Sequence, residues 1–156
     1  AGTPIAIQAA LDGVKEISIF NLDDAQWAQA EKNVEIINRE TDCKATLHYL
    51  EDKEDFKKEI ASSYIYCDAT GVGMKPLEDM TFVEDPSWFH KDMIVFDTVY
   101  APRETKLMKV AKEAGVDHVL NGSGMMLEQG AEAFKLWIGE DMPVDYIREL
   151  LFSEDN

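Results

Sequence analysis

Apolar residues along the chain follow two alternating patterns: short continuous runs, and longer segments in which they recur every three or four positions. The short runs are typical of strands buried in a sheet, and the wider spacing is typical of helices that bury one face. The runs predict strands at Ile17–Phe20, Lys44–Leu50, Tyr64–Ala69, Met93–Val99 and Val116–Leu120. The spaced segments predict helices at Ile5–Leu11, Ala25–Thr41, Asp55–Ser62, Thr105–Ala114, Gly124–Gly139 and Pro143–Phe152, and a single helical turn at Pro86–Phe89.

Strands that alternate with helices predict an α/β fold, in which helices cover both faces of a parallel sheet. Polar or glycine-rich loops follow four of the strands, at Asn21–Asp24, Thr70–Gly73, Thr98–Tyr100 and Gly122–Gly124. Each loop alone also fits a plain turn, because Gly, Asn, Asp and Pro are turn formers. Ligands of such sheets bind at the carboxyl ends of the strands, so the four loops together favour a binding site at this edge.

The start of the chain departs from a Rossmann-like, doubly wound sheet, which begins with a strand, a glycine loop and a helix. Here Ala1-Gly2 looks like the tail of such a loop and leads straight into the helix at Ile5–Leu11. The absent strand would be central, between the strands at Ile17–Phe20 and Tyr64–Ala69, and without it two rows of backbone donors and acceptors would be unpaired. We therefore expect a piece of a larger protein, with its first strand missing and its glycine loop incomplete.

The stretch from Asn121 to Gly139 joins a strand end, a glycine turn and a helix. Backbone N–H groups at the start of a helix can bind an anion or a carbonyl oxygen. Gln129 lies in the second turn, either as a ligand-binding amide or as a solvated side chain, and Gly139 ends the helix. Apolar residues at helical spacing predict that the helix buries one face; they are Met126, Ala133, Phe134, Trp137 and Ile138.

Charge and composition narrow the class of partner. The chain has 156 residues, a formal net charge of −16 and 46% hydrophobic residues, a composition typical of a folded domain. The charge argues against nucleic acid and anionic membranes, because their phosphate groups are bound by clustered Lys and Arg. No apolar run reaches the roughly 20 residues that span a bilayer, and no leader pattern signals secretion. We expect a cytoplasmic location.

The cysteines and histidines do not indicate a metal site. Cys43 and Cys67 lie in or beside predicted strands, where thiols act as small hydrophobic groups, and their number fits a reducing compartment. His48, His90 and His118 are scattered along the chain, without the paired spacing of metal ligands. We expect no bound metal.

Three blocks of sequence resemble the nucleotide-binding domain of shikimate dehydrogenases. They are Asp68–Met74, Asp97–Pro102 and Gly122–Ala131, in this order and each at a strand end. The resemblance covers the chain from Ala1 to about Phe152 and is strongest to the quinate/shikimate dehydrogenase branch. It implies hydride transfer between NAD or NADP and a hydroxyl group of shikimate or quinate, giving 3-dehydroshikimate or 3-dehydroquinate, in aromatic amino acid biosynthesis or the quinate pathway.

The resemblance also implies a set of site residues. It places the nicotinamide near Val99, Tyr100 and Gly122, and it makes Gln129 and Tyr100 contacts of the substrate. The catalytic Lys–Asp pair belongs to the amino-terminal domain of the family and is not in this chain, so we expect the fragment alone to be inactive. The cofactor contacts selected from the resemblance, from the glycine loop at the start of the chain and from the charges after the strand at Ile17–Phe20 are Ala1, Gly2, Asn21, Asp23, Asp24, Thr70, Gly71, Thr98, Val99, Tyr100, Gly122 and Met125.

We interpret residues 1–156 as the NAD(P)-binding half of a two-domain dehydrogenase. The last two helices, at about 124–139 and 143–152, are expected to contact the amino-terminal catalytic domain, because the final helix is apolar on more than one side. A homodimer is left open. Two alternatives also stay open: another two-domain dehydrogenase, such as a methylene-tetrahydrofolate dehydrogenase, or a non-catalytic nucleotide-binding module.

The residues after the strand at Ile17–Phe20 bear on the choice of cofactor. NADP-using members of the family typically have an arginine after the asparagine there, whereas this chain has Asn21-Leu22-Asp23-Asp24. An acidic residue at this place accepts from the ribose 2′-hydroxyl and repels a 2′-phosphate, so we predict that NAD is preferred and leave NADP as a second cofactor. Alternatively, both carboxylates are charges favoured by the dipole of the next helix.

One further departure from the family concerns the strand at Tyr64–Ala69. Asp68 stands where the family usually has Asn. The sequence predicts that it lies at the end of the strand, and it assigns the side chain no role.

Overall fold

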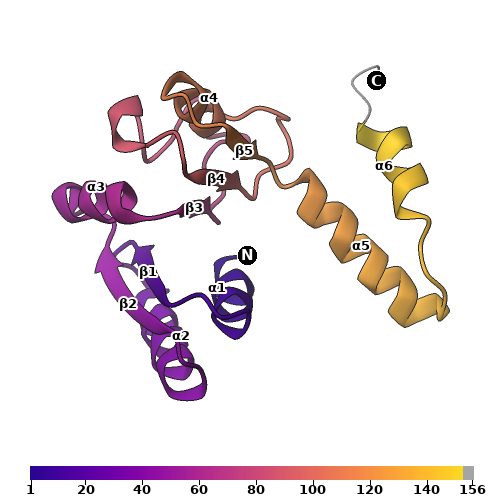
Figure 1. Ribbon diagram of the computed structural model, residues 1–156, viewed down its shortest axis with the longest axis horizontal. Helices are drawn as coiled ribbons and strands as arrows, with labels where there is room; N and C mark the ends of the chain where they lie inside the picture. Colours follow the sequence, from indigo (N-terminus) through magenta and orange to yellow (C-terminus); the bar gives the residue numbers. More distant parts are fainter. Residues whose placement is uncertain (153–156) are drawn as a thin grey trace. The chain divides into compact units, whose positions relative to one another are not determined.

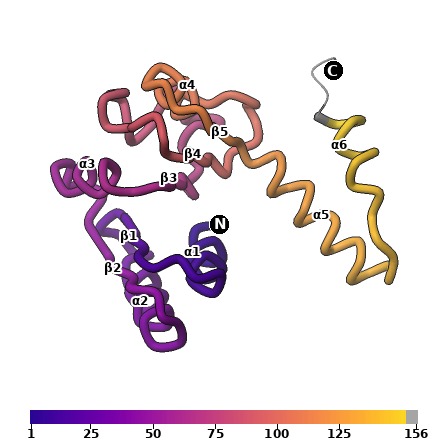
Figure 2. Tube along the Cα trace, viewed as in Figure 1, coloured from indigo at the N-terminus to yellow at the C-terminus, as the bar shows by residue number. Residues whose placement is uncertain are grey.

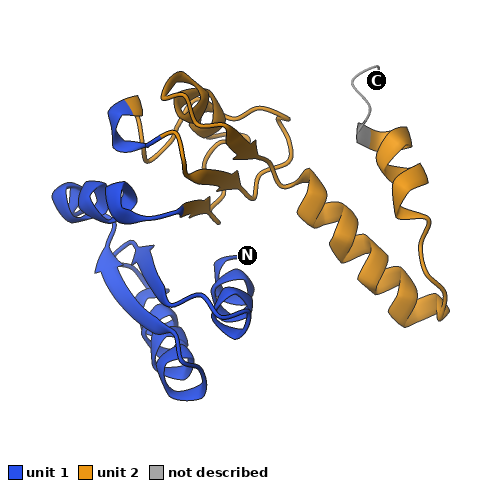
Figure 3. Cartoon of the chain, viewed as in Figure 1, with its two compact units in different colours: residues 1–64, 87–90 blue, residues 65–86, 91–156 orange. Residues whose placement is uncertain are grey.

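Strands and helices alternate along the chain in the computed structural model. Over the residues 1–152 that the structure describes, five strands alternate with six α-helices and one short 3-10 helix (Figure 1). The chain divides into two compact units, one formed by residues 1–64 and 87–90 and the other by residues 65–86 and the chain from residue 91 onward (Figure 3). The α/β prediction is confirmed.

The first unit contains a two-stranded parallel sheet. Its elements are α1 (Gly2–Leu11), β1 (Glu16–Asn21), α2 (Trp27–Glu40), β2 (Lys44–Tyr49) and α3 (Lys53–Ser62). The strands pair in register from Glu16 opposite Lys44 to Asn21 opposite Tyr49. Helices α1 and α2 and the sheet share a small apolar core built on Ala10, Ile37, Cys43 and Ala45.

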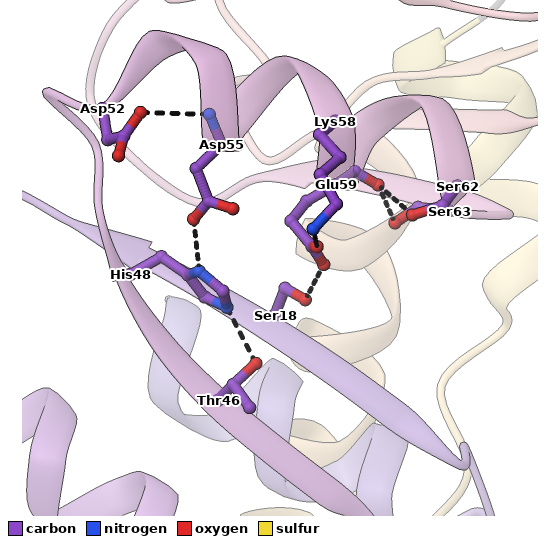
Figure 4. Close-up of polar contacts among 9 residues, drawn as sticks. All are labelled: Ser18, Thr46, His48, Asp52, Asp55, Lys58, Glu59, Ser62 and Ser63. Carbon is purple, nitrogen blue, oxygen red and sulfur yellow. Dashed lines mark hydrogen bonds and ion pairs between the residues drawn. The ribbon is translucent and has the colours of Figure 1, made fainter.

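Polar side chains connect α3 to the strands of this unit (Figure 4). His48 on β2 contacts Asp55 Oδ2 at 2.6 Å and Thr46 Oγ1 at 2.8 Å. The Ser18 hydroxyl on β1 donates to Glu59 at 2.6 Å. Helix α3 begins two residues earlier than predicted, because Asp52 accepts from the Asp55 N–H and caps the helix.

The short 3-10 helix η1 (Pro86–Trp88) confirms the helical turn predicted near Pro86. Trp88 packs edge-on against Phe56 of α3, with ring centroids 6.0 Å apart. His90 Nε2 lies 2.9 Å from the carbonyl oxygen of Ser63. This short segment therefore belongs to the first unit.

The second unit contains a three-stranded parallel sheet in the order β3-β4-β5. Its core is formed by residues such as Met93 and Val95 of the sheet region and Leu107 and Ala111 of α4, all at most 2% exposed. Its elements are β3 (Ile65–Asp68), β4 (Ile94–Asp97), α4 (Lys106–Glu113), β5 (His118–Leu120), α5 (Ser123–Ile138) and α6 (Val144–Phe152).

The element boundaries differ from the predicted ones by a few residues. Gly2 already belongs to α1, Asn21 still belongs to β1, and Gly124 lies inside α5 rather than in the turn before it. Gly139 ends α5 in the left-handed conformation, with φ of 81°, as predicted. The last helix begins at Val144, one residue after Pro143.

The predicted buried face of α5 is only partly covered within this chain. Ala133 and Phe134 are half-buried, whereas Trp137 is 79% exposed and Ile138 61% exposed. Leu127, outside the predicted face, is the buried residue of the helix. Figure 2 traces the chain from α5 into α6, and the two helices are joined by the ion pair between Arg148 and Glu128. Helical spacing identifies an apolar face but does not identify what covers it, so α5 has the predicted pattern with only part of the predicted burial.

Candidate functional site

The loop after β3 is shaped by the buried side chain of Asp68. Its Oδ1 accepts hydrogen bonds from the Thr70 N–H at 2.8 Å and from the Thr70 hydroxyl at 2.6 Å. Thr70 and Gly71 are themselves exposed. Burial raises the pKa of the Asp68 carboxyl and the charge of Asp97 adds to this rise, while the two bonds from Thr70 oppose it. Asp68, to which the sequence assigned no role, therefore fixes the turn that exposes Thr70 and Gly71.

The raised pKa predicts the effect of replacing Asp68 by asparagine. The amide oxygen of the new side chain would still accept from Thr70, but the side chain would carry no buried charge. Because the folded-state pKa lies above the unfolded value, ionisation of Asp68 costs stability once the pH exceeds the ordinary carboxyl range. Asp68→Asn should therefore raise the melting temperature at pH 7 by a few degrees, roughly the effect of 1 kcal/mol.

This gain should shrink as the pH falls through the raised pKa of Asp68, because the protonated carboxyl of the wild type carries no buried charge. Thermal unfolding between pH 4 and pH 8 measures the difference. Asp92→Asn, the same change at an exposed position, controls for the lower net charge. An Asp68→Asn protein that is less stable than wild type at pH 7 contradicts the assignment.

The loop after β4 is held by Asp97, the last residue of that strand. Asp97 is 1% exposed, and its Oδ1 accepts from the Val99 N–H at 2.9 Å. The Thr98 N–H donates to the carbonyl oxygen of Asp68 at 2.9 Å, which continues the pairing of β3 with β4. Thr98 and Val99 are buried, whereas Tyr100 is 51% exposed. The loop thus presents the Tyr100 ring outward from a rigid base.

Gly122, at the start of α5, packs directly against this loop. Its N–H donates to the carbonyl oxygen of Val99 at 3.0 Å. A Cβ atom at Gly122 would overlap the carbonyl oxygen of Thr98, so only glycine fits here without a shift of the backbone. The structure therefore brings together three of the residues that were expected to contact the cofactor: Thr98, Val99 and Gly122.

Two further residues expected to contact the cofactor or the substrate, Met125 and Gln129, lie on α5. Met125, in the first turn, lines a cleft of about 420 Å³ together with Phe96, Met108 and Leu120. Gln129, in the second turn, is exposed. Its side-chain amide is therefore accessible to a ligand.

The selected residues of the first unit lie after β1 and at the start of α1. Asp24 Oδ1 accepts from the Gln26 N–H at 2.8 Å and from Asn21 Nδ2 at 3.4 Å. The Asp23 N–H donates to Glu51 Oε1 at 3.3 Å. Ala1 is the N-cap of α1 and Gly2 its first residue. Asp24 thus accepts from a backbone donor just before α2, and both Asp23 and Asp24 are exposed.

Sequence reasoning missed the roles of Asp97, Thr105 and Glu51. Asp97 was part of a recognised block but was read as a strand end, and Thr105 was read as the start of a helix. A threonine directly before a helix is a typical N-cap, which is the signal that identifies Thr105. Glu51 lies between the strand predicted at Lys44–Leu50 and the helix predicted at Asp55–Ser62, and nothing in the sequence pairs it with the Asp23 N–H.

Neither a membrane-spanning helix nor a metal cluster occurs among the described residues. In residues 1–152, no helix is both long and apolar enough to cross a membrane. Within the same part of the chain, no three His, Cys, Asp or Glu side chains lie together as metal ligands would.

Comparison with known proteins gives consistent matches. The family model described as the shikimate 5'-dehydrogenase C-terminal domain matches residues 122–152. A shikimate dehydrogenase (NADP(+)) of Streptococcus uberis is 62% identical over 156 residues, which are 100% of this chain and 53% of that protein. The chain therefore spans about half the length of the curated relatives it matches.

Two solved structures extend the comparison. The crystal structure of shikimate 5-dehydrogenase from Listeria monocytogenes in complex with shikimate and NAD is 56% identical, with a TM-score of 0.92 over 97% of this chain and 52% of that one. Quinate dehydrogenase from Corynebacterium glutamicum in complex with NAD is 28% identical, with a TM-score of 0.81 over 95% of this chain and 50% of that one. Both likenesses extend over nearly the whole of this chain.

Proposed function

We propose that residues 1–156 are the NAD(P)-binding half of a two-domain oxidoreductase. The proposal rests on the family: the chain belongs to the shikimate dehydrogenase family and corresponds to the C-terminal, nucleotide-binding domain of its members. The substrate of this oxidoreductase is a hydroxy acid of the shikimate or quinate type. Shikimate is supported by the names of the relatives at 62% and 56% identity, which also disfavour the methylene-tetrahydrofolate alternative. The catalytic Lys–Asp pair is proposed to come from the other half of the protein, so that this chain alone is inactive.

The observation that carries the proposal is the junction of Gly122 with the Thr98–Val99 loop. Because Gly122 has no side chain and its N–H is bonded to Val99, the start of α5 and the loop form one continuous backbone wall. Such a wall can receive a flat ring, and Tyr100 projects from its edge. A bound nicotinamide supplies the hydride acceptor. The chain's own residues hold the ring and exclude water from one side of it, which favours transfer between fixed partners.

We propose that NAD is preferred over NADP and that the Asp23 carboxylate determines this preference. Asp24 is engaged with the Gln26 N–H, so the exposed Asp23 carboxylate is the better candidate for the ribose 2′-hydroxyl. Glu51 adds a second carboxylate at this position by accepting from the Asp23 N–H. A 2′-phosphate would therefore meet two negative charges and a backbone donor that is already bonded. The preference runs against the NADP(+) in the names of the curated relatives, and titration of both cofactors decides it.

The apolar surface of α5 and α6 is proposed to be the contact with the catalytic domain. It consists of exposed residues that occur on both helices: Leu136, Trp137, Ile138, Tyr146, Leu150 and Leu151. Side chains of this size are 51–81% exposed here, and apolar surface of this kind usually marks an interface. The curated relatives are about twice as long as this chain, which provides a domain to cover it.

Replacing Gln129 by Ala tests the proposed function. In the two-domain protein, Gln129→Ala should raise the KM for shikimate roughly tenfold, the effect of one lost hydrogen bond to a substrate, while the dissociation constant of the cofactor stays within about twofold. Steady-state kinetics and a fluorescence titration measure the two quantities. Glu132→Ala, on the next turn of α5 and also exposed, should change neither. The proposed function is contradicted if the wild-type two-domain protein oxidises neither shikimate nor quinate with NAD or NADP.

A further inference from the structure

Two loops that carry selected cofactor residues rest on one buried pair of side chains, Asp97 and Thr105. Each is 1% exposed. Asp97 Oδ2 accepts the Thr105 hydroxyl at 2.6 Å, and Thr105 Oγ1 accepts from the Met108 N–H at 3.4 Å, which caps α4. Hydrogen bonds to a carboxylate are short and strong, and water does not compete with them in a buried site. The pair is therefore a rigid element inside the second unit.

One side of the pair holds the loop after β4. Asp97 Oδ1 accepts from the Val99 N–H at 2.9 Å, and the Val99 carbonyl oxygen in turn accepts from the Gly122 N–H at 3.0 Å. The position of the Asp97 carboxylate thus sets the position of Val99 and of the wall formed with Gly122. The Thr105 hydroxyl fixes the other oxygen of the same carboxylate.

The other side of the pair supports the loop after β3. Gly73 has φ of +99°, and a Cβ atom there would lie 3.2 Å from Thr105 Cγ2 and 3.8 Å from Asp97 Oδ2. The backbone of Gly73 therefore lies directly against the pair. The pair thus lies against this loop, which carries Thr70 and Gly71, and Asp97 also holds the loop at Thr98–Tyr100 through the Val99 N–H.

We propose that Asp97 and Thr105 are positioning residues, which hold the loops at 70–73 and 98–100 in one arrangement and so set the geometry of hydride transfer. The inference rests on the proposed function. Neither side chain contacts the reacting atoms; Asp97 acts through Val99, and Thr105 acts through Asp97 and Gly73. A displacement of about 1 Å in a site of this kind can cost roughly a hundredfold in rate, so a single internal hydrogen bond can matter to the reaction.

Two substitutions of Thr105 separate its hydroxyl from its methyl group. Thr105→Val keeps the shape and removes the hydrogen bond to Asp97, whereas Thr105→Ser keeps the hydrogen bond and removes the methyl group. In the two-domain protein, Thr105→Val should lower kcat at least roughly tenfold and speed amide hydrogen exchange in peptides covering residues 70–74 and 98–101. Thr105→Ser should restore most of kcat and slow exchange again.

Thr41→Val is the matched control. The Thr41 hydroxyl also donates one hydrogen bond, to the Ile37 carbonyl at 2.8 Å, and accepts one, from the Cys43 N–H at 3.1 Å, but it lies at the end of α2 outside both loops. It should lower the melting temperature and leave kcat unchanged when measured below that temperature. Equal losses in Thr41→Val, or a kcat and exchange pattern in Thr105→Val within about twofold of wild type, overturn the inference. Because hydrogen exchange needs no substrate, the pair is tested even if the wild-type protein lacks the proposed activity.

Discussion

Gly122→Ala should be a highly damaging substitution, although it adds a single methyl group. The new Cβ would overlap the Thr98 carbonyl oxygen, and the atom it meets belongs to backbone that is fixed by two hydrogen bonds. Thr98 donates to the carbonyl oxygen of Asp68, and Val99 accepts from Gly122. The loop cannot move aside without breaking these bonds. We expect the free energy of unfolding to fall by about 3 kcal/mol, the upper end of what overpacking costs.

The measurement is urea unfolding of the variant and of a matched control. Gly124→Ala makes the same change two residues later, inside α5, where a Cβ atom meets nothing within 4 Å. Alanine is the better helix former, so this control should be neutral or gain up to about 1 kcal/mol. If the two variants unfold at the same urea concentration, the contact between α5 and the Thr98 loop is not as tight as the structure has it.

The sequence predicted the strands and helices because their apolar periods differ clearly. The run around Met93–Val99 is continuous and the spacing in Thr105–Ala114 is helical, and the structure has β4 and α4 there. In the second unit, the edge at which the loops after β3, β4 and β5 lie followed from the alternation alone, since the parallel strands of one sheet all end on one side. This is why Thr98, Val99 and Gly122 could be selected together before their contacts were known.

The predictions that failed have a common physical cause. The spacing of apolar and polar residues along the chain does not show which groups each side chain contacts in the fold. The apolar stripe of α5 was read as buried, yet Trp137 and Ile138 are exposed among the described residues. Asp68, Asp97 and Thr105 are polar residues that the sequence could assign only to strand ends and a helix start. Their roles depend on which backbone N–H or hydroxyl faces each carboxylate, and this is fixed only when the strands pair.

A double substitution after β1 should reverse the cofactor preference. Leu22→Arg together with Asp23→Ser removes the carboxylate proposed to bind the ribose 2′-hydroxyl and adds a guanidinium that can bind a 2′-phosphate. Both positions are exposed, so neither change disturbs the core. Each charge-assisted hydrogen bond contributes roughly 1.5–3 kcal/mol. We therefore expect the ratio of NAD to NADP affinity to fall roughly a hundredfold in the two-domain protein, as measured by fluorescence titration of both cofactors.

The control for this reversal makes the same change in net charge at two positions on α2, away from the loop after β1. Glu35→Ser with Ile36→Arg also removes one carboxylate and adds one guanidinium, at exposed positions in the middle of the helix. If long-range charge alone set the preference, this variant would shift the ratio nearly as far, although charges beyond about 10 Å are largely screened at 0.1 M salt. Local recognition predicts that only the substitution at Leu22 and Asp23 changes it. Wild-type protein that binds NADP more tightly than NAD would instead show that the carboxylates of Asp23 and Glu51 do not exclude the 2′-phosphate.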